Sequence, residues 1–240
     1  MSAEGTGPVP GDHADRIRWN AKWAAGPAPS FTPHPLAVQA LAPDLPDGPV
    51  ADLACGPSGA VLLAAAQGLR VTAVDVSEVA LGRLDEEARR RGLAHLITLV
   101  HADLSAWVPE PRSYALVLAT GYWDADVFAC AAAAVTDGGL LGWEALTAEA
   151  LRRHPDLPPE FCAGPGEPAS LLPAGFTVID QADVPHRARR RLLARRLPPS
   201  ALAMTHGRRS VAGIRYPPRH ETRGDGHECG RIPGVENGCG

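Results

Sequence analysis

Short apolar runs alternate with longer helix-forming segments through the middle of the chain. Runs that are apolar at nearly every position, rather than at every second position, are typical of strands that are covered on both faces of a sheet. We expect such strands at Val50–Ala54, Arg70–Val74, Leu96–Val100, Tyr114–Ala119 and Leu140–Leu146.

The segments around these strands have the features of helices. Ser77–Gly92 carries Leu81, Leu84 and Ala88 on one face at spacings of three and four residues, and Gly92 is a natural helix stop. Strands that are joined through helices need crossover connections, which predict a parallel sheet. The other helices are predicted at Asp12–Ala25, Pro35–Ala42, Gly59–Gly68 and Asp124–Val135.

Beyond Thr147 the alternation weakens. Pro155–Pro173 is expected to be a loop, followed by a sixth strand at Gly175–Val184 and a seventh at Arg189–Leu197. The sequence therefore predicts an α/β fold with a doubly wound, mostly parallel seven-stranded sheet and helices on both faces. This domain is placed at residues 12–197, and it is flanked by a flexible leader at residues 1–11 and a disordered tail at residues 198–240.

Composition and charge fit a globular protein. Of the 240 residues, 45% are hydrophobic and 21% are charged. Residues 1–184 carry 11 basic and 23 acidic side chains, whereas residues 185–215 carry nine arginines and no acid. An acidic body argues against broad contact with a nucleic-acid backbone, which requires a basic surface, so we expect no nucleic-acid partner.

Targeting and cysteine patterns add little. The first residues lack the basic and then apolar layout of a signal peptide, and runs such as Ala60–Ala66 are too short to cross a bilayer. We therefore expect a cytoplasmic protein without membrane contact. The five cysteines form no C-x-x-C pair, so neither a disulfide framework nor a metal site is expected.

Small residues between Val50 and Gly59 lie where a strand turns into a helix. Gly56 permits a tight turn with positive φ and lets a ligand approach the backbone, and ligands bind at this edge of open parallel sheets. The stretch lacks the G-x-G-x-x-G spacing of a NAD site. Asp52, at the strand end, would repel a phosphate but attract a cationic amino group.

Two further acids follow strand ends. Asp75 lies 19 residues after Gly56, close to the offset of about 20 residues that is typical of a ribose-binding acid, and a carboxylate can accept both ribose hydroxyls. Asp103 follows the third strand, where it can accept a hydrogen bond from an adenine amino group. Together the three acids fit a ligand with an ammonium group, a ribose and an adenine but no phosphate.

Residues 50–146 resemble the class I methyltransferases that depend on S-adenosylmethionine (SAM). The stretch Asp52-Leu-Ala-Cys-Gly56 is similar to the glycine-rich first motif of that family, Val71–Asp75 to its second acidic strand, and Ala102-Asp103 to its adenine-side motif. The segment Trp19-Asn-Ala-Lys-Trp23 resembles the aromatic segment that covers the cofactor in the tellurite-resistance and thiopurine methyltransferase-like branch. The resemblance implies a Rossmann-like methyltransferase fold.

The resemblance also implies that SAM is the cofactor. Pro57-Ser58 stands where the family usually has a second glycine, and Ser58 is small enough to keep the contact and to hydrogen-bond the carboxylate end of SAM. The predicted cofactor-binding residues are Trp19, Asp52, Ala54, Cys55, Gly56, Ser58, Asp75, Val76, Ser77, Asp103, Leu104 and Thr120.

The methyl acceptor is expected at the end of the fourth strand. Methyl transfer from a sulfonium is an in-line displacement in which the protein mainly supplies alignment, so a general base is optional. Tyr122 and Trp123 can stack on the acceptor or face the sulfonium, and Glu144 can orient the acceptor or take a proton. These three residues are the catalytic candidates; aromatic packing residues and a surface carboxylate are the alternatives.

The sequence thus predicts a SAM-dependent methyltransferase that acts on a small molecule such as a thiol or a chalcogen oxyanion. The chain lacks the Asn/Asp-Pro-Pro-Tyr/Phe and Pro-Cys motifs of nucleic-acid base methyltransferases. Alternatives are an RNA or protein methyltransferase that uses the arginine-rich segment 187–196, a non-catalytic SAM-binding regulator, and a NAD-dependent oxidoreductase. For segment 187–196 we favour an edge strand with solvated arginines, because charge protects exposed edges.

Overall fold

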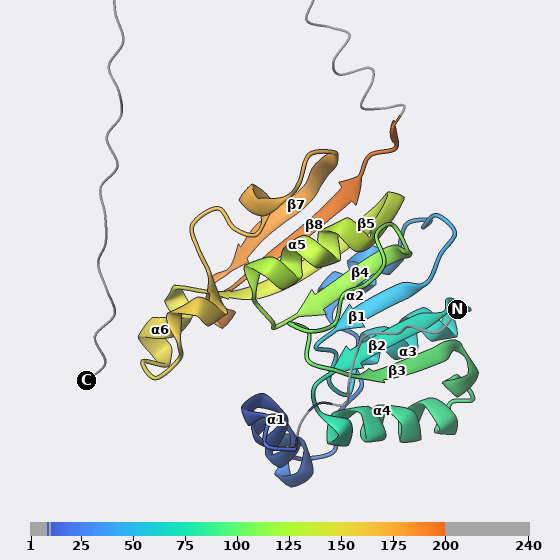
Figure 1. Ribbon diagram of the computed structural model, residues 1–240, viewed down its shortest axis with the longest axis vertical. Coiled ribbons are helices and arrows are strands. Elements are labelled where there is room, and N and C mark those ends of the chain that lie inside the picture. Colours follow the sequence, from blue (N-terminus) through green and yellow to red (C-terminus); the bar gives the residue numbers. More distant parts are fainter. Residues whose placement is uncertain (1–8, 10, 200–240) are drawn as a thin grey trace, which may run out of the picture.

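The computed structural model describes residue 9 and residues 11–199. The predictions of a leader at residues 1–11 and a tail at residues 198–240 therefore fall almost wholly outside the described residues. What is described is a twisted sheet with helices packed on both faces (Figure 1).

The sheet has the strand order β3-β2-β1-β4-β5-β8-β7. The first five strands of this order pair in parallel, and β8 runs antiparallel to both β5 and β7. Because the chain moves outward from β1 in both directions, the carboxyl ends of β1 and β4 form a topological switch point. The strands are β1 Val50–Leu53, β2 Val71–Asp75, β3 Ile97–His101, β4 Tyr114–Thr120, β5 Val135–Thr147, β6 Cys162–Ala163, β7 Phe176–Val184 and β8 Arg189–Arg196.

Helices begin where a side chain can satisfy the free N–H groups of the first turn. Ser58 accepts hydrogen bonds from the backbone N–H groups of Ala60 and Val61, and Asp124 accepts one from Val127. The helices are α1 Ala14–Ala25, α2 Pro35–Leu41, α3 Gly59–Ala66, α4 Glu78–Arg90, α5 Ala125–Ala134 and α6 Glu149–Arg153.

Two apolar cores lie on opposite faces of the sheet. One core is formed with α2, α3 and α4, and it includes the fully buried Leu36, Leu62 and Leu84. The other is formed with α5, where Phe128 packs edge-on against Trp143 of β5 at a centroid distance of 5.2 Å. Burial on both faces explains why β1, β4 and the central part of β5 are mainly apolar.

The predicted strands and helices are found within a few residues of their expected bounds, but the C-terminal third differs in detail. β5 begins at Val135 instead of Leu140 and contains an irregularity in its pairing with β4. The predicted loop Pro155–Pro173 includes β6, a two-residue strand that pairs in parallel with the end of β5. The described sheet therefore has eight strands rather than seven.

The prediction of a solvated edge strand for segment 187–196 is wrong. β8 lies between β5 and β7, and its Leu192 and Leu193 are buried. Two of its arginines are paired with acids of the neighbouring strands: Arg190 with Asp183 of β7, and Arg191 with Glu144 of β5. Arg195 and Arg196 donate to backbone carbonyls, so this basic stretch can lie inside the sheet.

Across residues 11–199 no helix is both long enough and apolar enough to span a bilayer.

Replacing Phe128 by alanine should lower the free energy of unfolding by about 3–5 kcal/mol, because the ring is fully buried between α5 and β5. Val108→Ala is the control: this side chain is 75% exposed, and its loss should change stability by less than about 0.5 kcal/mol. Urea denaturation of the three proteins measures both values. Equal stability of Phe128→Ala and the native chain would contradict this assignment of the core.

Candidate cofactor and acceptor site

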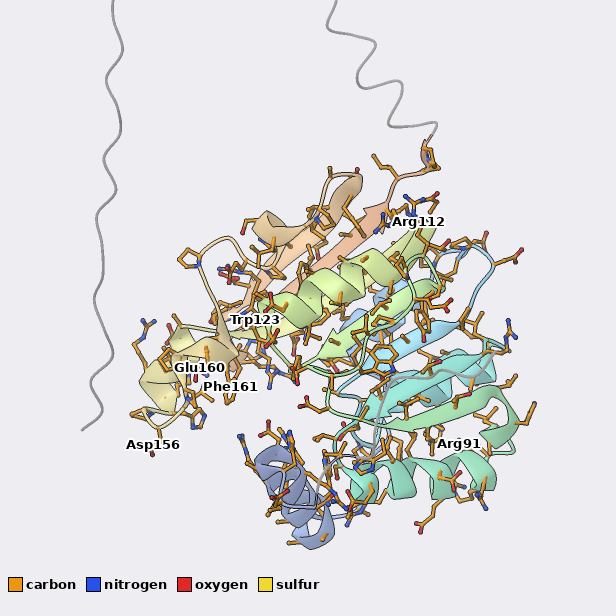
Figure 2. The ribbon with its side chains drawn as sticks, viewed as in Figure 1. Arg91, Arg112, Trp123, Asp156, Glu160 and Phe161 are labelled. Atoms are coloured by element: carbon orange, nitrogen blue, oxygen red, sulfur yellow. The ribbon has the colours of Figure 1, made fainter. Side chains whose placement is uncertain are left out.

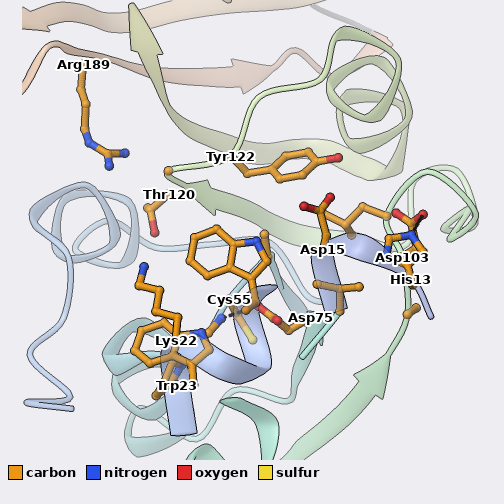
Figure 3. A pocket seen from close by; sticks show the side chains of 18 residues that line it. His13, Asp15, Lys22, Trp23, Cys55, Asp75, Asp103, Thr120, Tyr122 and Arg189 are labelled. Atoms are coloured by element: carbon orange, nitrogen blue, oxygen red, sulfur yellow. Dashed lines mark hydrogen bonds and ion pairs between the residues drawn. The ribbon is translucent and has the colours of Figure 1, made fainter. Parts of the chain in front are cut away.

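A cavity of about 320 Å³ lies between α1 and the carboxyl ends of β1, β2 and β4 (Figure 3). Its size falls within the range of roughly 300–1,000 Å³ that is usual for small-molecule sites. The structure brings ten of the predicted site residues to this one cavity: Trp19, Ala54, Cys55, Gly56, Asp75, Val76, Asp103, Leu104, Thr120 and Tyr122.

The turn after β1 forms the floor of the cavity. Ala54 and Gly56 both have left-handed backbone conformations, with φ of 47° and 57°, and the backbone N–H of Cys55 donates to the carbonyl of Val74. A Cβ atom on Gly56 would lie 3.2 Å from Cζ2 of Trp23 in α1. Glycine therefore serves both the backbone conformation and the close approach of α1 at this position.

Asp75 joins two turns at the edge of the sheet. Its Oδ2 accepts a hydrogen bond of 2.7 Å from the backbone N–H of Gly56, and its Oδ1 accepts one of 2.8 Å from that of Ser77. Burial raises the pKa of Asp75 above its ordinary value, and the two backbone hydrogen bonds oppose that shift. Each carboxylate oxygen has a further lone pair, so Asp75 can still accept two hydroxyl groups from a ligand.

Asp103 lies at the other end of the cavity, after β3. It accepts hydrogen bonds from the backbone N–H and the hydroxyl of Ser105, and His13 Nε2 lies 3.1 Å from its Oδ2. Burial alone would raise the pKa of Asp103, but the bonds from Ser105 and His13 outweigh it and lower the pKa. The carboxylate of Asp103 is thus held ionised at this end of the cavity, where it can accept a hydrogen bond.

Three of the predicted cofactor residues lie beneath the cavity wall and do not line it. Ser58 donates to Asp52 Oδ2 at 2.6 Å while it caps α3. Ser77 caps α4 and donates to Asn20 of α1. Burial raises the pKa of Asp52 to about 7 against the opposing hydrogen bond from Ser58. These side chains support the turns that carry the lining residues.

α1 covers the cavity with aromatic and cationic side chains. Lys22 Nζ lies 4.1 Å from the ring centroid of Trp19 and 5.0 Å from that of Trp23. None of the α1 residues is buried, and the helix is attached through polar contacts such as the ion pair between Arg16 and Glu78. The cover is therefore bound less firmly than the strands beneath it.

The three catalytic candidates lie in different surroundings in the structure. Tyr122 lines the cavity, and burial raises the pKa of its hydroxyl far above the ordinary value. Trp123 lies beside the start of α5 and packs in the core against Phe128 (Figure 2). Glu144 is buried and does not line the cavity.

Glu144 is surrounded by basic side chains. Arg191 Nε donates to its Oε2 at 2.6 Å, His34 Nε2 lies 3.2 Å from the same oxygen, and Arg189 Nη1 lies 3.4 Å from Oε1. Burial alone would raise the pKa of Glu144, but His34 and the two arginines outweigh it and hold the pKa at about 2. The carboxylate is the counter-ion of this basic cluster.

Several lining residues were not among the predicted site residues. A sequence signal existed for those of α1, since acidic, aromatic and basic residues recur there at helical spacing. Arg189 had no such signal, because its place follows from the antiparallel return of β8 along β5. The unpredicted lining residues used below are His13, Asp15, Lys22, Trp23 and Arg189.

A comparison with protein families points to the same part of the chain as the cavity does. Residues 50–139 match the family described as a methyltransferase domain, and this range contains the turn after β1, Asp75 and Asp103. This part of the chain is therefore similar to methyltransferase domains. No curated protein matches the chain.

Solved structures share the fold of this chain at low sequence identity. A geranyl diphosphate C-methyltransferase from Streptomyces coelicolor A3(2), determined with S-adenosyl-L-homocysteine, is 13% identical with a TM-score of 0.55, covering 81% of this chain and 88% of its own. The CcbJ methyltransferase from Streptomyces caelestis is 17% identical with a TM-score of 0.55, covering 75% and 96%. The [4+2]-cyclase SpnF is 16% identical with a TM-score of 0.60, covering 80% and 98%.

Replacing Glu144 by glutamine should destabilise the fold by about 3 kcal/mol at pH 7, because it leaves the half-buried Arg189 and Arg191 without a counter-ion. The pKa of Glu144 is about 2, below the ordinary 4.5, so its stabilising contribution is complete above pH 4.5 and is lost as the pH falls toward 2. The difference between the two proteins should therefore shrink on acidification.

Denaturant titrations at pH 7 and pH 3 measure this change, with the exposed Glu110→Gln as the control. The Glu110 variant should match the native chain within about 0.5 kcal/mol at both pH values. A stability difference for Glu144→Gln that does not depend on pH would rule out a titrating counter-ion at this position.

Proposed function

We propose that the cavity under α1 binds SAM and that the chain transfers its methyl group to a small molecule. The observation that carries the proposal is the position of Asp75. Its two oxygens each accept one backbone N–H and have acceptor capacity left over, and the residue lines the cavity, as binding of a ribose diol requires. SAM would supply an activated methyl group, and the residues of this chain bind and align the reactants.

The other lining residues give the site two ends. Asp103 would accept from the adenine amino group, and Trp19 of α1 would cover the cofactor. Thr120 and Tyr122, after β4, would face the methionine part and the acceptor. We leave Trp123 and Glu144 out of the proposed catalytic set, because the first packs in the core and the second is the counter-ion of three basic groups.

For the acceptor we propose a thiol, a chalcogen oxyanion or a similar small molecule. This part rests on the resemblance of segment 19–23 to the tellurite-resistance and thiopurine methyltransferase-like branch. The named methyltransferases with this fold include one for geranyl diphosphate, which supports small-molecule acceptors in general. A cytoplasmic location likewise remains a prediction from the sequence.

Arginine-guided binding of RNA finds no support in the surroundings of β8. Arg190 and Arg191 are paired with acids of the neighbouring strands, and the segment lies inside the sheet. Phosphate recognition would need these side chains to be free on one surface.

Replacing Asp75 by asparagine should weaken the binding of S-adenosyl-L-homocysteine by roughly ten- to a hundredfold, since hydrogen bonds to a charged group contribute about 1.5–3 kcal/mol. Isothermal titration calorimetry measures the dissociation constants. Asp85→Asn, on the exposed side of α4 where it pairs with Arg89, is the matched control and should bind as the native chain does.

The ribose contact itself is isolated by comparing adenosine with 2′,3′-dideoxyadenosine. The native chain should prefer adenosine, and Asp75→Asn should lose that preference even if the turn has shifted. An unchanged preference in the variant would disprove the ribose assignment.

Methyl transfer is tested by following the formation of S-adenosyl-L-homocysteine from SAM in the presence of thiols, selenite, tellurite and amines. We expect acceptor-dependent turnover with at least one of these classes and its loss in Asp75→Asn. Binding of SAM without turnover of any acceptor would favour a non-methylating role, as the cyclase with the same fold illustrates.

A further inference from the structure

The charges around the cavity are separated by sign. Asp15, Asp75 and Asp103 lie along one side, whereas Lys22 and Arg189 approach from the other (Figure 3). In the same view the ends of Lys22 and Arg189 point toward each other, on either side of Thr120. The molecules that bind in this cavity should therefore present negative groups at the end formed by α1, β4 and β8.

Arg189 is fixed in place but has donors to spare. It begins β8, and its Nη1 lies 3.4 Å from Glu144 Oε1, beyond an ordinary hydrogen bond. Glu144 shares its one negative charge with Arg191 and His34, so Arg189 is only partly compensated. Within residues 11–199 the guanidinium of Arg189 forms no hydrogen bond, and 29% of the side chain is exposed.

The backbone after β4 makes room for this guanidinium. Gly121 has a φ of 94°, and a Cβ atom there would lie 2.9 Å from Nη1 of Arg189. The N–H of Gly121 donates to the carbonyl of Glu144, which fixes the turn against β5. Arg189 therefore lies directly over the turn at the end of β4, where the acceptor side of the cavity begins.

Lys22 would pair with the one carboxylate that SAM carries. Burial, Arg18 and Arg189 lower the pKa of Lys22, while Asp75 opposes the shift, so its ammonium interacts with both ends of the cavity. Lys22 also belongs to the cover, next to Trp19. With the cofactor's carboxylate opposite Lys22, the donors of Arg189 are left for the second substrate.

We propose that Arg189 is a specificity-determining residue that binds an anionic group, a carboxylate or a phosphate, of the methyl acceptor. A planar guanidinium donates two parallel hydrogen bonds to such a group, which a neutral group of the same shape cannot accept equally well. The proposal rests on the proposed function, because it assigns the substrate class of the same site.

The test uses the full chain saturated with S-adenosyl-L-homocysteine and two pairs of probes at constant ionic strength. Benzoate is compared with benzamide, and phenyl phosphate with phenol, by ligand-observed NMR titration. The native chain should bind one of the anions at least tenfold more tightly than its neutral partner, and the pair that shows this distinguishes carboxylate from phosphate. Arg189→Gln should lose the preference while its affinity for S-adenosyl-L-homocysteine stays within twofold.

Arg187→Gln is the matched control, because Arg187 is exposed, lies two residues away and does not line the cavity. It should keep the preference for anions. Arg189→Lys keeps the charge but not the paired donors and should retain part of the preference, and it replaces the glutamine variant if thermal unfolding shows that Arg189→Gln does not fold.

Two results would overturn the proposal: no preference for either anion in the native chain, or a loss of at least tenfold in S-adenosyl-L-homocysteine affinity in Arg189→Gln, which would assign Arg189 to the cofactor. Failure of the native chain to bind S-adenosyl-L-homocysteine would instead defeat the proposed function. In that case the same probe titrations on the protein alone still decide whether Arg189 binds anions.

Discussion

The buried carboxylate of Asp75 is the constraint on which the site depends. It accepts hydrogen bonds from Gly56 in the turn after β1 and from Ser77 in the turn after β2, two residues that lie 21 positions apart along the chain. A buried carboxylate without such partners would be costly, so this single group holds both turns at a fixed separation. The same atoms form part of the cavity wall. Architecture and ligand recognition therefore share one side chain, and a change at Asp75 alters both.

α1 is joined to this rigid edge by polar contacts. Arg16 pairs with Glu78, Asn20 accepts a hydrogen bond from Ser77, and His13 contacts Asp103. None of the residues in α1 is buried, so its detachment exposes little apolar surface and costs less free energy than opening the sheet. A cover of this kind lets ligands enter while the strand ends beneath it keep their geometry. Its aromatic and cationic side chains are part of the cavity only while the helix is in place.

The sequence predicted the parallel half of the sheet and its cavity-facing strand ends, because both are encoded locally. Continuous apolar runs identify doubly covered strands, and Gly56 and Asp75 lie at the expected spacing around the first crossover. The antiparallel part of the sheet was harder to predict from the sequence. The position of β8 between β5 and β7, and with it the place of Arg189, depends on the pairing of β8 with β5, about fifty residues earlier in the chain. A run of arginines alone predicts a solvated segment, because the sequence does not show which acids lie on the neighbouring strands.

Two buried acids of the sheet show why residue type and position do not settle a role. Asp75 ends β2, and Glu144 lies opposite the last residue of β4, yet their surroundings differ in sign. Asp75 meets backbone donors and keeps lone pairs for a ligand, whereas Glu144 meets His34, Arg189 and Arg191. A carboxylate whose pKa is about 2 is a poor proton acceptor near neutrality, so Glu144 is unsuited to act as a general base. Its effect on the site passes through Arg189, whose guanidinium it draws over the turn at Gly121 without satisfying its hydrogen bonds. Glu144 therefore helps to hold the guanidinium of Arg189 at the edge of the cavity.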